Sequence, residues 1–264
     1  MRIAGAAARL HERAAHIIRD CRTTMRQIRR ALRAVLGFGR GMLSYPAAWF
    51  GLFRPRDELA ALVAELLIVG FYGSNTRSLS ARLLARQIRR GEVGGVFFVT
   101  QNIGTMDEVR DLLRLFRAGP ARPLIAIDQE GGVVQRLGRT RGFTPLPSAQ
   151  KVADTMSPEK ARALYSVAGK ELAALGFNIN LGPVLDFHHP DNPAIGGAQR
   201  SYGIDPERIA AYGEAFAGGF ASAGVLCAAK HFPGHGCSVV DSHYGIADVS
   251  AGWTEAELPQ SPGQ

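Results

Sequence analysis

From about residue 56 onward, short apolar runs alternate with longer segments in which apolar residues recur at helical spacing. The apolar runs are bounded by glycine or proline and predict five buried strands, at 66–72, 96–99, 123–127, 177–185 and 225–229. The segments that follow them predict four helices, at 79–90, 107–117, 158–175 and 206–223, and the stretch 128–157 reads as a loop rich in glycine and proline. Gly91 and Gly176 follow two of these helices, where a left-handed glycine commonly ends a helix.

This alternation predicts an α/β fold made of parallel βα units. With right-handed crossovers such units build either a (β/α)8 TIM-type barrel or an open, doubly wound sheet, and the pattern alone does not separate the two. A closed barrel needs eight strands. With five strands we therefore expect an incomplete barrel of about five βα units, in which the first and fifth strands have unpaired edges and apolar side chains are exposed.

The first 56 residues differ from the rest, so the chain divides into a basic, partly helical N-terminal extension (1–56) and a main domain (57–264). Apolar residues recur at helical spacing within 1–36, with arginines between them, and 42–53 is rich in aromatic residues and proline. Three interpretations stay open. The segment could lie on an anionic membrane surface, serve as an arginine-rich targeting peptide, or be a poorly ordered extension from a start codon placed too early.

Most of the charge belongs to that extension. The 264 residues carry a formal net charge of +8, but residues 1–56 hold 12 arginines and two acidic residues, so the main domain carries a net charge of −2. A near-neutral domain lacks the basic surface of a nucleic-acid-binding fold, and no nucleic-acid partner is expected. A content of 46% hydrophobic and 20% charged residues excludes global disorder, and no apolar run is long enough for a membrane-spanning helix. Three widely spaced cysteines indicate no disulfide framework and favour a reducing compartment.

Polar side chains follow the third, fourth and fifth expected strands directly. The third strand runs into DQEGG at 128–132, the fourth ends at Asp186 before the loop 192–203, and the fifth ends in KHFPGHG at 230–236. In both α/β architectures, ligands bind at the carboxyl ends of the strands. Loops rich in aspartate, histidine, arginine and lysine at that place predict a site for a polar, hydroxylated ligand.

Each of these groups also has a purely structural interpretation. Asp128 and Asp186 could simply accept backbone hydrogen bonds at strand ends, and Glu130 could orient the glycine loop that follows it. Asp241 could cap a turn, with His243 on the surface. What favours a site is that three consecutive strands deliver such clusters to one end of the sheet.

No metal ion or cofactor is expected. Four histidines, at 188, 189, 231 and 235, lie in the same loops, but their spacing matches no metal-binding motif. The positive charge of Lys230 beside them would also oppose a metal ion.

Taken together, these motifs resemble glycoside hydrolase family 3, in particular its bacterial β-N-acetylglucosaminidase branch of the NagZ type. The resemblance covers roughly residues 60–258, and the short Asp-Ser-His loop separates this branch from the β-glucosidases of the family. It implies a (β/α)8-type barrel. It rests on four segments in the same order as in the family: 128–136, the strand end PVLD at 183–186, the loop 192–203, and 230–243 with KHFPGHG and DSH.

The resemblance also implies roles for seven residues. In the family, the equivalents of His243 and Asp241 are the general acid/base and its dyad partner. The implied activity is that of a β-N-acetylhexosaminidase, which removes terminal β-linked N-acetylglucosamine with retention and takes part in peptidoglycan recycling. The equivalents of five further residues hold the sugar ring: Asp128, Arg136, Arg200, Lys230 and His231.

The residue types suit these roles. A retaining glycosidase first protonates the leaving oxygen and later deprotonates water. An imidazole with an ordinary pKa of about 6.5 can do both near neutral pH. A carboxylate at Asp241, two positions before His243, can reach the other ring nitrogen in a turn and favour the protonated form.

The sequence contains no counterpart of the family's nucleophile, which is an aspartate in a Ser-Asp-Asp type motif on a later strand. The chain ends 21 residues after His243, and Asp248 is the only acidic residue between His243 and Thr254. We expect Asp248 on a loop and not as a nucleophile. Three interpretations follow: a C-terminally truncated glycosidase, a fragment of an intact enzyme, or a non-catalytic sugar-binding module that keeps the binding residues.

The natural substrate stays open among a muropeptide sugar, a chitin oligomer and a glycosylated small molecule, because the loops that contact the aglycone cannot be read. A related β-glucoside specificity is an alternative. Since a histidine acid/base does not repel an anion, phosphorolysis is an alternative to hydrolysis. We expect a cytoplasmic protein with peripheral membrane contact through 1–56, and the sequence predicts no oligomeric state.

Overall fold

The computed structural model describes residues 58–250, 252 and 254. All of them lie in one compact unit, Arg54–Gln264. The extension predicted for 1–56 and the tail 255–264 lie outside the described residues, so the predicted domain boundary stays a prediction.

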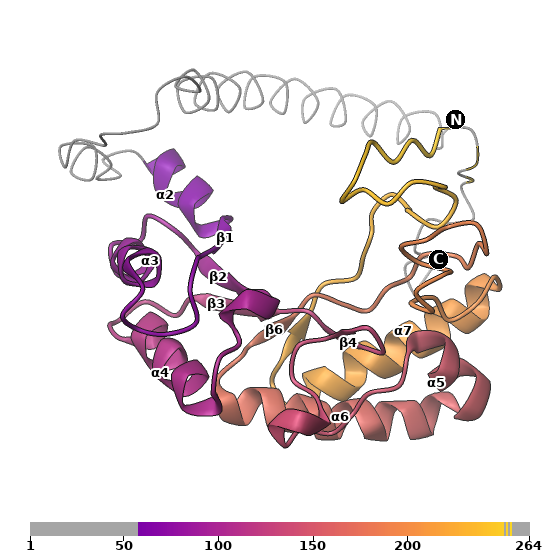
Figure 1. Ribbon diagram of the computed structural model, residues 1–264, viewed down its shortest axis with the longest axis horizontal. Helices are drawn as coiled ribbons and strands as arrows, with labels where there is room; N and C mark the ends of the chain where they lie inside the picture. Colours follow the sequence, from indigo (N-terminus) through magenta and orange to yellow (C-terminus); the bar gives the residue numbers. More distant parts are fainter. Residues whose placement is uncertain (1–57, 251, 253, 255–264) are drawn as a thin grey trace, which may run out of the picture. The chain divides into compact units, whose positions relative to one another are not determined.

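A five-stranded parallel sheet forms the centre of this unit, in the order β1-β2-β3-β6-β7 (Figure 1). Each strand pairs with the next strand of the sheet along the chain, for example Val69 with Val96, and Ile179 with Leu226. All five predicted strands are confirmed, and each is shorter than predicted or shifted by a residue. They are β1 (Ile68–Gly70), β2 (Gly95–Phe98), β3 (Leu124–Ile127), β6 (Ile179–Asn180) and β7 (Leu226–Cys227).

All four predicted helices are also confirmed. Each begins at a residue whose side chain accepts a backbone N–H of the first turn, namely Ser78, Thr105, Ser157 or Asp205. Gly176 ends the third of them in the left-handed conformation, with φ of 117°. The helices are α3 (Leu79–Arg89), α4 (Met106–Arg117), α6 (Pro158–Leu175) and α7 (Pro206–Ala221).

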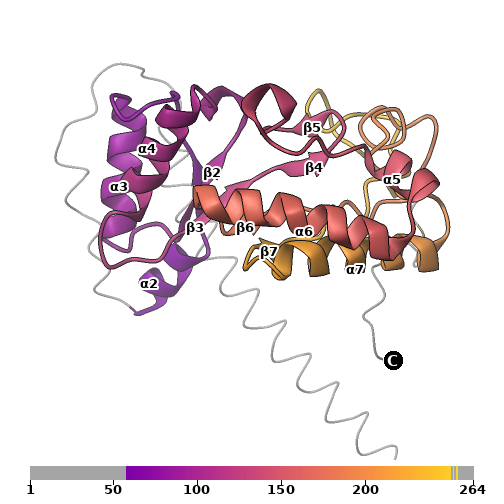
Figure 2. The same cartoon turned by 90° about the horizontal axis from the view of Figure 1, so that it is seen from below.

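Strand order decides between the two architectures that the pattern left open. A doubly wound sheet reverses its strand order at a switch point and carries helices on both faces. Here the strands follow the order of the chain, and α3, α4, α6 and α7 cover one face of the sheet (Figures 1 and 2). The fold is therefore of the (β/α)8 barrel type, and the sheet is not closed.

The two outer strands have the open edges that were predicted. Within the described residues, no strand pairs with the outer edge of β1 or β7. Apolar side chains are exposed near both edges, including Leu66 at 82% and Leu226 at 59%. None of the described helices is long and apolar enough to cross a membrane.

The stretch 128–157, which was predicted as loop, contains regular structure. Strands β4 (Gln129–Gly131) and β5 (Val134–Gln135) form a two-stranded antiparallel hairpin. The 3-10 helix η3 (Arg139–Arg141) and helix α5 (Ala149–Thr155) follow it. The pattern missed these elements, and also α2 (Glu58–Glu65) and η2 (Thr100–Asn102), because each spans too few residues for a period to be recognised.

The core lies between the sheet and the helices that cover it. Phe71, Phe98, Phe116 and Phe177 pack edge to face, with ring centroids 5.1 to 5.9 Å apart. Beside them α6 and α7 run side by side (Figure 2). Their close approach requires a glycine at position 219, because a Cβ atom there would lie 2.6 Å from the Cβ of Tyr165.

Candidate active site

Asp128 lies at the carboxyl end of β3 and joins two cations from distant parts of the chain. Its Oδ1 accepts a hydrogen bond from Lys230 Nζ at 2.9 Å, and its Oδ2 accepts one from Arg136 Nη2 at 3.0 Å. These three side chains are 14 to 20% exposed. Asp128 is thus a partly buried acceptor held between two donors, and it does not serve merely as an acceptor for backbone groups.

Glu130 lies two residues further along and joins the same lysine to Arg200. Its Oε1 contacts Lys230 Nζ at 2.6 Å and Arg200 Nη2 at 2.9 Å, while its Oε2 accepts from Arg200 Nε at 2.8 Å. The side chain of Glu130 is 8% exposed. The sequence predicts only that Glu130 could orient the glycine loop, whereas the structure places it between two of the predicted binding residues.

The hairpin β4–β5 fixes where Glu130 and Arg136 lie. The buried side chain of Gln129 accepts from the backbone N–H groups of Arg136 and Leu137, both at 3.1 Å. Gly131 turns the chain with φ of 116°, and a Cβ atom there would lie 2.2 Å from the carbonyl oxygen of Pro147. The contacts of Gln129 and Gly131 therefore fix the backbone from which the side chains of Glu130 and Arg136 project.

Asp186, at the end of the fourth predicted strand, is the most deeply buried acid of the site. Its Oδ2 lies 2.5 Å from His231 Nδ1, and its Oδ1 accepts from the backbone N–H of His235 at 2.6 Å. Its side chain is 1% exposed. With the Nδ1 proton of His231 directed at this carboxylate, Nε2 faces Arg200 Nη2 at 3.4 Å. Asp186 thus fulfils the predicted structural role of a backbone acceptor and also orients a predicted binding residue.

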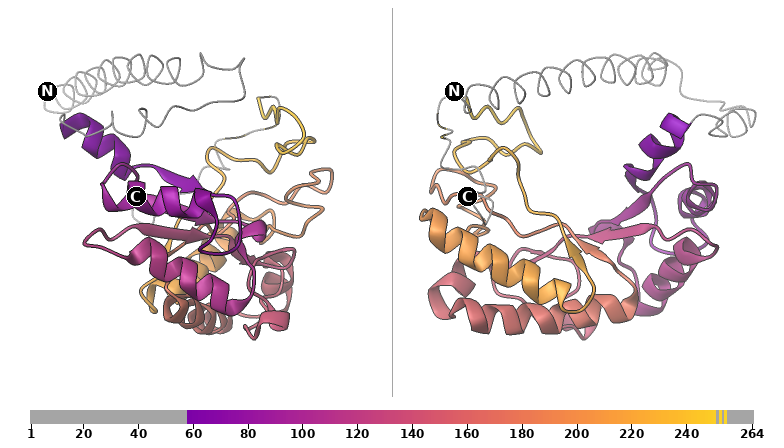
Figure 3. Two further views of the ribbon diagram at one scale, coloured as in Figure 1. Left: turned by 60° about the vertical axis from the view of Figure 1, so that its left-hand side comes forward. Right: turned by 180° about the vertical axis from the view of Figure 1, so that it is seen from behind.

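Two fully buried residues that sequence reasoning missed connect the loops of the site. Asn192 donates from Nδ2 to the carbonyl oxygens of His235 and Gly236, at 2.7 and 3.0 Å. Ser201 donates from Oγ to the carbonyl oxygen of Asp186 at 2.6 Å. The segments that follow β6 and β7 consequently lie side by side at one end of the sheet (Figures 1 and 3). The sequence carries no signal for either role, because the burial of these side chains and their partners depend on the folded chain.

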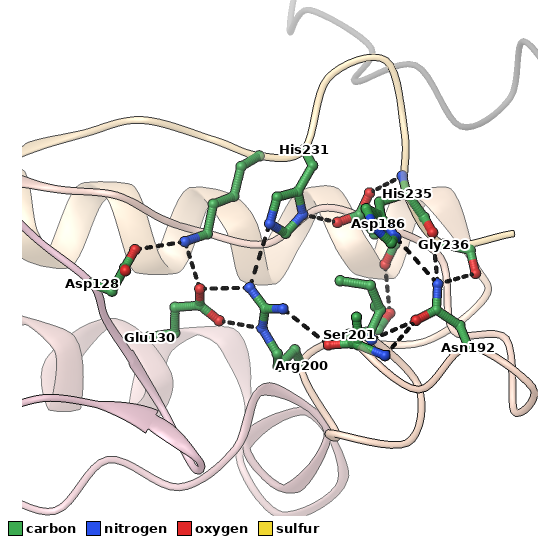
Figure 4. A network of polar contacts seen from close by, with 12 residues as sticks. Asp128, Glu130, Asp186, Asn192, Arg200, Ser201, His231, His235 and Gly236 are labelled. Atoms are coloured by element: carbon green, nitrogen blue, oxygen red, sulfur yellow. Dashed lines mark hydrogen bonds and ion pairs between the residues drawn. The ribbon is translucent and has the colours of Figure 1, made fainter. Parts of the chain in front are cut away.

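The five predicted binding residues come together in this way in one network. Figure 4 shows the continuous chain of contacts from Asp128 through Glu130 and Arg200 to His231 and Asp186. The network contains three carboxylates and three permanent cations, so its formal charges balance. Burial by itself lowers the pKa of the Arg200 guanidinium, but the hydrogen bonds and charge of Glu130 outweigh that effect and leave the pKa raised.

The two predicted catalytic residues form a separate pair. Asp241 Oδ1 lies 2.7 Å from His243 Nδ1 and also accepts the backbone N–H of His243 at 2.9 Å. These bonds lower the pKa of the Asp241 carboxyl. The side chain of His243 is 79% exposed and that of Asp241 is 24% exposed. Within the described residues, no hydrogen bond or ion pair joins this pair to the network of the binding residues.

Asp248, the remaining acid of this loop, lies as expected outside regular structure. Its Oδ1 accepts from the backbone N–H of Ser250 at 2.9 Å, and the bonds from Ser250 lower the pKa of Asp248. Among the described residues, no group of three or more histidine, cysteine, aspartate or glutamate side chains is arranged to hold a metal ion.

This arrangement can bind a neutral ligand with many hydroxyl groups. An ammonium has three N–H groups and a guanidinium five, so Lys230 and Arg200 each keep a donor beyond their contacts within the protein. Arg136 Nε is buried and has no hydrogen-bond partner among the described residues. Asp128 can accept further hydrogen bonds, because each carboxylate oxygen has two lone pairs. Since the charges balance, the network has no excess of positive charge to attract a phosphate or a carboxylate.

Comparison with known proteins agrees with this chemistry. Residues 59–259 match the family model described as the glycosyl hydrolase family 3 N terminal domain. A protein named beta-hexosaminidase from Pseudomonas aeruginosa is 39% identical over 165 residues, which are 62% of this chain and 48% of the relative. Beta-hexosaminidase LpqI from Mycobacterium tuberculosis is 35% identical over 201 residues, which are 76% of this chain and 48% of the relative. The chain therefore spans about half the length of these curated relatives.

Solved structures show the same similarity in three dimensions. A glycoside hydrolase family 3 beta-N-acetylglucosaminidase from a Paenibacillus species superposes with a TM-score of 0.61 and 37% identity. The superposition covers 70% of this chain and 35% of that one. At this level of identity the shared fold and the shared order of motifs point to common ancestry.

Proposed function

This chain belongs to glycosyl hydrolase family 3, and from that premise we propose that it acts on terminal β-linked N-acetylglucosamine as a retaining β-N-acetylhexosaminidase. The names of its relatives support the reaction class. The observation that carries the proposal is the charge-balanced network at the carboxyl ends of β3, β6 and β7, together with the acid/base pair on the following loop.

Sugar binding rests on the donors and acceptors that the network leaves available. In this proposal Asp128 accepts from a sugar hydroxyl, while Lys230 and Arg136 donate to its neighbours. Arg200 and His231 hold the other side of the ring. N-acetylglucosamine carries no charge, which suits a site whose own charges balance.

Proton transfer rests on the pair of Asp241 and His243. Because Asp241 contacts Nδ1 of the imidazole, Nε2 is the nitrogen available to a leaving group. The imidazolium form donates a proton to the departing oxygen, and the neutral form later takes one from water. The high exposure of His243 leaves it accessible to an incoming ligand.

The reaction also requires a nucleophile, and the described residues supply none that suits. Asp248 is exposed and its carboxylate is directed at Ser250. A second candidate function is therefore a sugar-binding module without catalysis, which the self-contained binding network favours.

Two measurements on the complete 264-residue chain test the proposal. Isothermal titration with N-acetylglucosamine tests binding, and release of 4-nitrophenol from 4-nitrophenyl N-acetyl-β-glucosaminide tests turnover. We expect His243→Ala to lower turnover at least about a hundredfold and to change sugar affinity little, because general acid–base catalysis contributes roughly 10²–10⁴. Normal turnover in this variant would remove His243 from the mechanism. Binding without any turnover by the wild-type chain would favour the second candidate.

The setting of the reaction is part of the proposal. A cytoplasmic location and a role in peptidoglycan recycling follow from the resemblance, and peripheral membrane contact follows from the composition of 1–56. Co-sedimentation of the chain with vesicles containing phosphatidylglycerol, compared with a variant lacking 1–56, tests the membrane contact.

A further inference from the structure

Two cations of the network, Lys230 and Arg200, share one carboxylate. Lys230 Nζ and Arg200 Nη2 contact the same oxygen, Oε1 of Glu130, at 2.6 and 2.9 Å. Because both nitrogens contact one oxygen atom, Lys230 Nζ and Arg200 Nη2 cannot be further apart than these two distances added together. At such a separation like charges repel strongly when water has little access, and Glu130 is 8% exposed.

The three side chains come from three separate segments of the chain, so the contact also holds those segments together. Glu130 lies in β4, Arg200 lies 70 residues later, and Lys230 follows β7. Arg200 is anchored additionally by its Nη1, which donates to the carbonyl oxygen of Ala194 at 2.9 Å. Lys230 has no anchor of that kind among the described residues beyond the two carboxylates.

We propose that Glu130 is a positioning residue of the sugar site, which keeps the ammonium of Lys230 directed toward Asp128 while Arg200 lies beside it. Glu130 does not contact the sugar. Its Oε1 already contacts both cations, its Oε2 accepts from Arg200, and its side chain is 8% exposed, so it acts on a ligand only through these cations. This inference rests on the proposed function for its ligand, but the arrangement of the three side chains can be tested without any ligand.

The ligand-free test is the rate at which acetic anhydride acylates Lys230 in the complete chain, read by peptide mass spectrometry at several time points. In Glu130→Gln the ammonium loses one of its two carboxylates but keeps Arg200 as a neighbour, so the lysine side chain is held less firmly and meets the reagent more often. We expect acylation to be about tenfold faster, because a charge-assisted contact that restrains the ammonium is lost.

Glu171→Gln is the matched control. Glu171 is a partly buried carboxylate that accepts from Thr144 N and Oγ1, at 3.0 and 2.8 Å, and contacts no cation of the site. Both variants lose one negative charge that accepts hydrogen bonds within the protein, so a general loss of stability affects both. Only Glu130→Gln should change the acylation of Lys230.

The second arm measures binding of N-acetylglucosamine to the same proteins. We expect Glu130→Gln to bind about tenfold more weakly than the wild-type chain and Glu171→Gln to bind equally well. If acylation of Lys230 is as slow in Glu130→Gln as in the wild-type chain, the positioning role is wrong. If the wild-type chain does not bind the sugar, the proposed ligand is wrong, and the acylation rate still decides the role of Glu130.

A variant with the opposite expected effect covers the case in which Glu130→Gln does not fold. Arg200→Gln removes the neighbouring cation and leaves Glu130 entirely to Lys230. The proposal then predicts slower acylation of Lys230 than in the wild-type chain. A faster rate in Arg200→Gln would contradict it.

Discussion

Replacing Asp186 by asparagine tests whether the buried carboxylate holds the loops of the site together. Asparagine has the same size but is uncharged, and it offers one acceptor oxygen where the carboxylate has two. In the structure both oxygens of Asp186 are used, one by His231 Nδ1 and one by the backbone N–H of His235. If the remaining oxygen keeps the N–H of His235, the new NH2 group faces His231 Nδ1. Moving the imidazole proton to Nε2 would only set it against Arg200 Nη2, so one donor lacks its acceptor in either tautomer.

The expected cost follows from these two bonds. A hydrogen bond to a charged group contributes about 1.5–3 kcal/mol, and a buried donor without a partner costs about 1–3 kcal/mol. Because the side chain is 1% exposed, neither water nor salt compensates. We therefore expect Asp186→Asn to lower the free energy of unfolding by about 3 kcal/mol, and the Tm by about 6–12 °C for a unit of this size.

Urea unfolding at pH 7, followed by circular dichroism, measures this quantity. The slope of the transition should be the same in the variant and the wild-type chain, so that the midpoint reports stability alone. Asp154→Asn is the matched control, because Asp154 is 55% exposed and pairs with Arg208 at 3.0 Å. An exposed pair contributes only about 0.2–1 kcal/mol. A loss of less than about 1 kcal/mol in Asp186→Asn would refute the argument.

Three further predictions follow from local contacts. Gly219→Ala should lower the free energy of unfolding by about 2 kcal/mol, because its Cβ would meet Tyr165 where α6 and α7 pack closely. Gly70→Ala, whose Cβ would have no atom within 4 Å, should change stability little, and equal urea midpoints for the two variants would contradict the prediction. Burial raises the pKa of the Cys227 thiol to about 12, so iodoacetamide at pH 8 should label Cys227 only after unfolding, and rapid labelling of the native chain would show that the thiol is accessible. Hydrogen bonds from His243 lower the pKa of Asp241 in the folded chain. The charged carboxylate therefore stabilises the folded state fully above the ordinary pKa of an aspartate, and this stabilisation is lost as the pH falls through the lowered pKa. In His243→Ala the carboxyl titration seen by NMR should move part of the way back, since the backbone N–H remains, and an unchanged midpoint would show that the imidazole contributes nothing.

Much of the fold could be predicted because its signals are local. The helix at 158–175 was predicted with its observed bounds, since Ser157 caps its start and Gly176 ends it. The hairpin at Gln129–Gln135 was missed because strands of two and three residues leave no readable period. The strand at 177–185 was predicted too long. Its regular pairing ends at Asn180, and Pro183, which has no N–H to donate, precedes an isolated bridge at Val184.

The residues of the site likewise divide into those that the motifs identified and those that only the folded chain reveals. The motifs identified the binding residues by their type and by their position at strand ends, and the structure brings all five into one network. The function of Glu130 could not be read from the motif, because its partners lie 70 and 100 residues away in the chain. Asn192 has a local signal only in its burial, which a sequence does not display.

The α/β alternation, the helix ends and the chemistry of the motifs could be predicted, because each depends on residues a few positions apart. Tertiary structure alone decided that the strands follow the chain order with helices on one face, which separates a barrel from a doubly wound sheet. It also decided which carboxylate neutralises which cation. Such pairings depend on how separate loops approach one another, and the physical reason is that a buried charge is stable only beside a partner that the folded chain delivers.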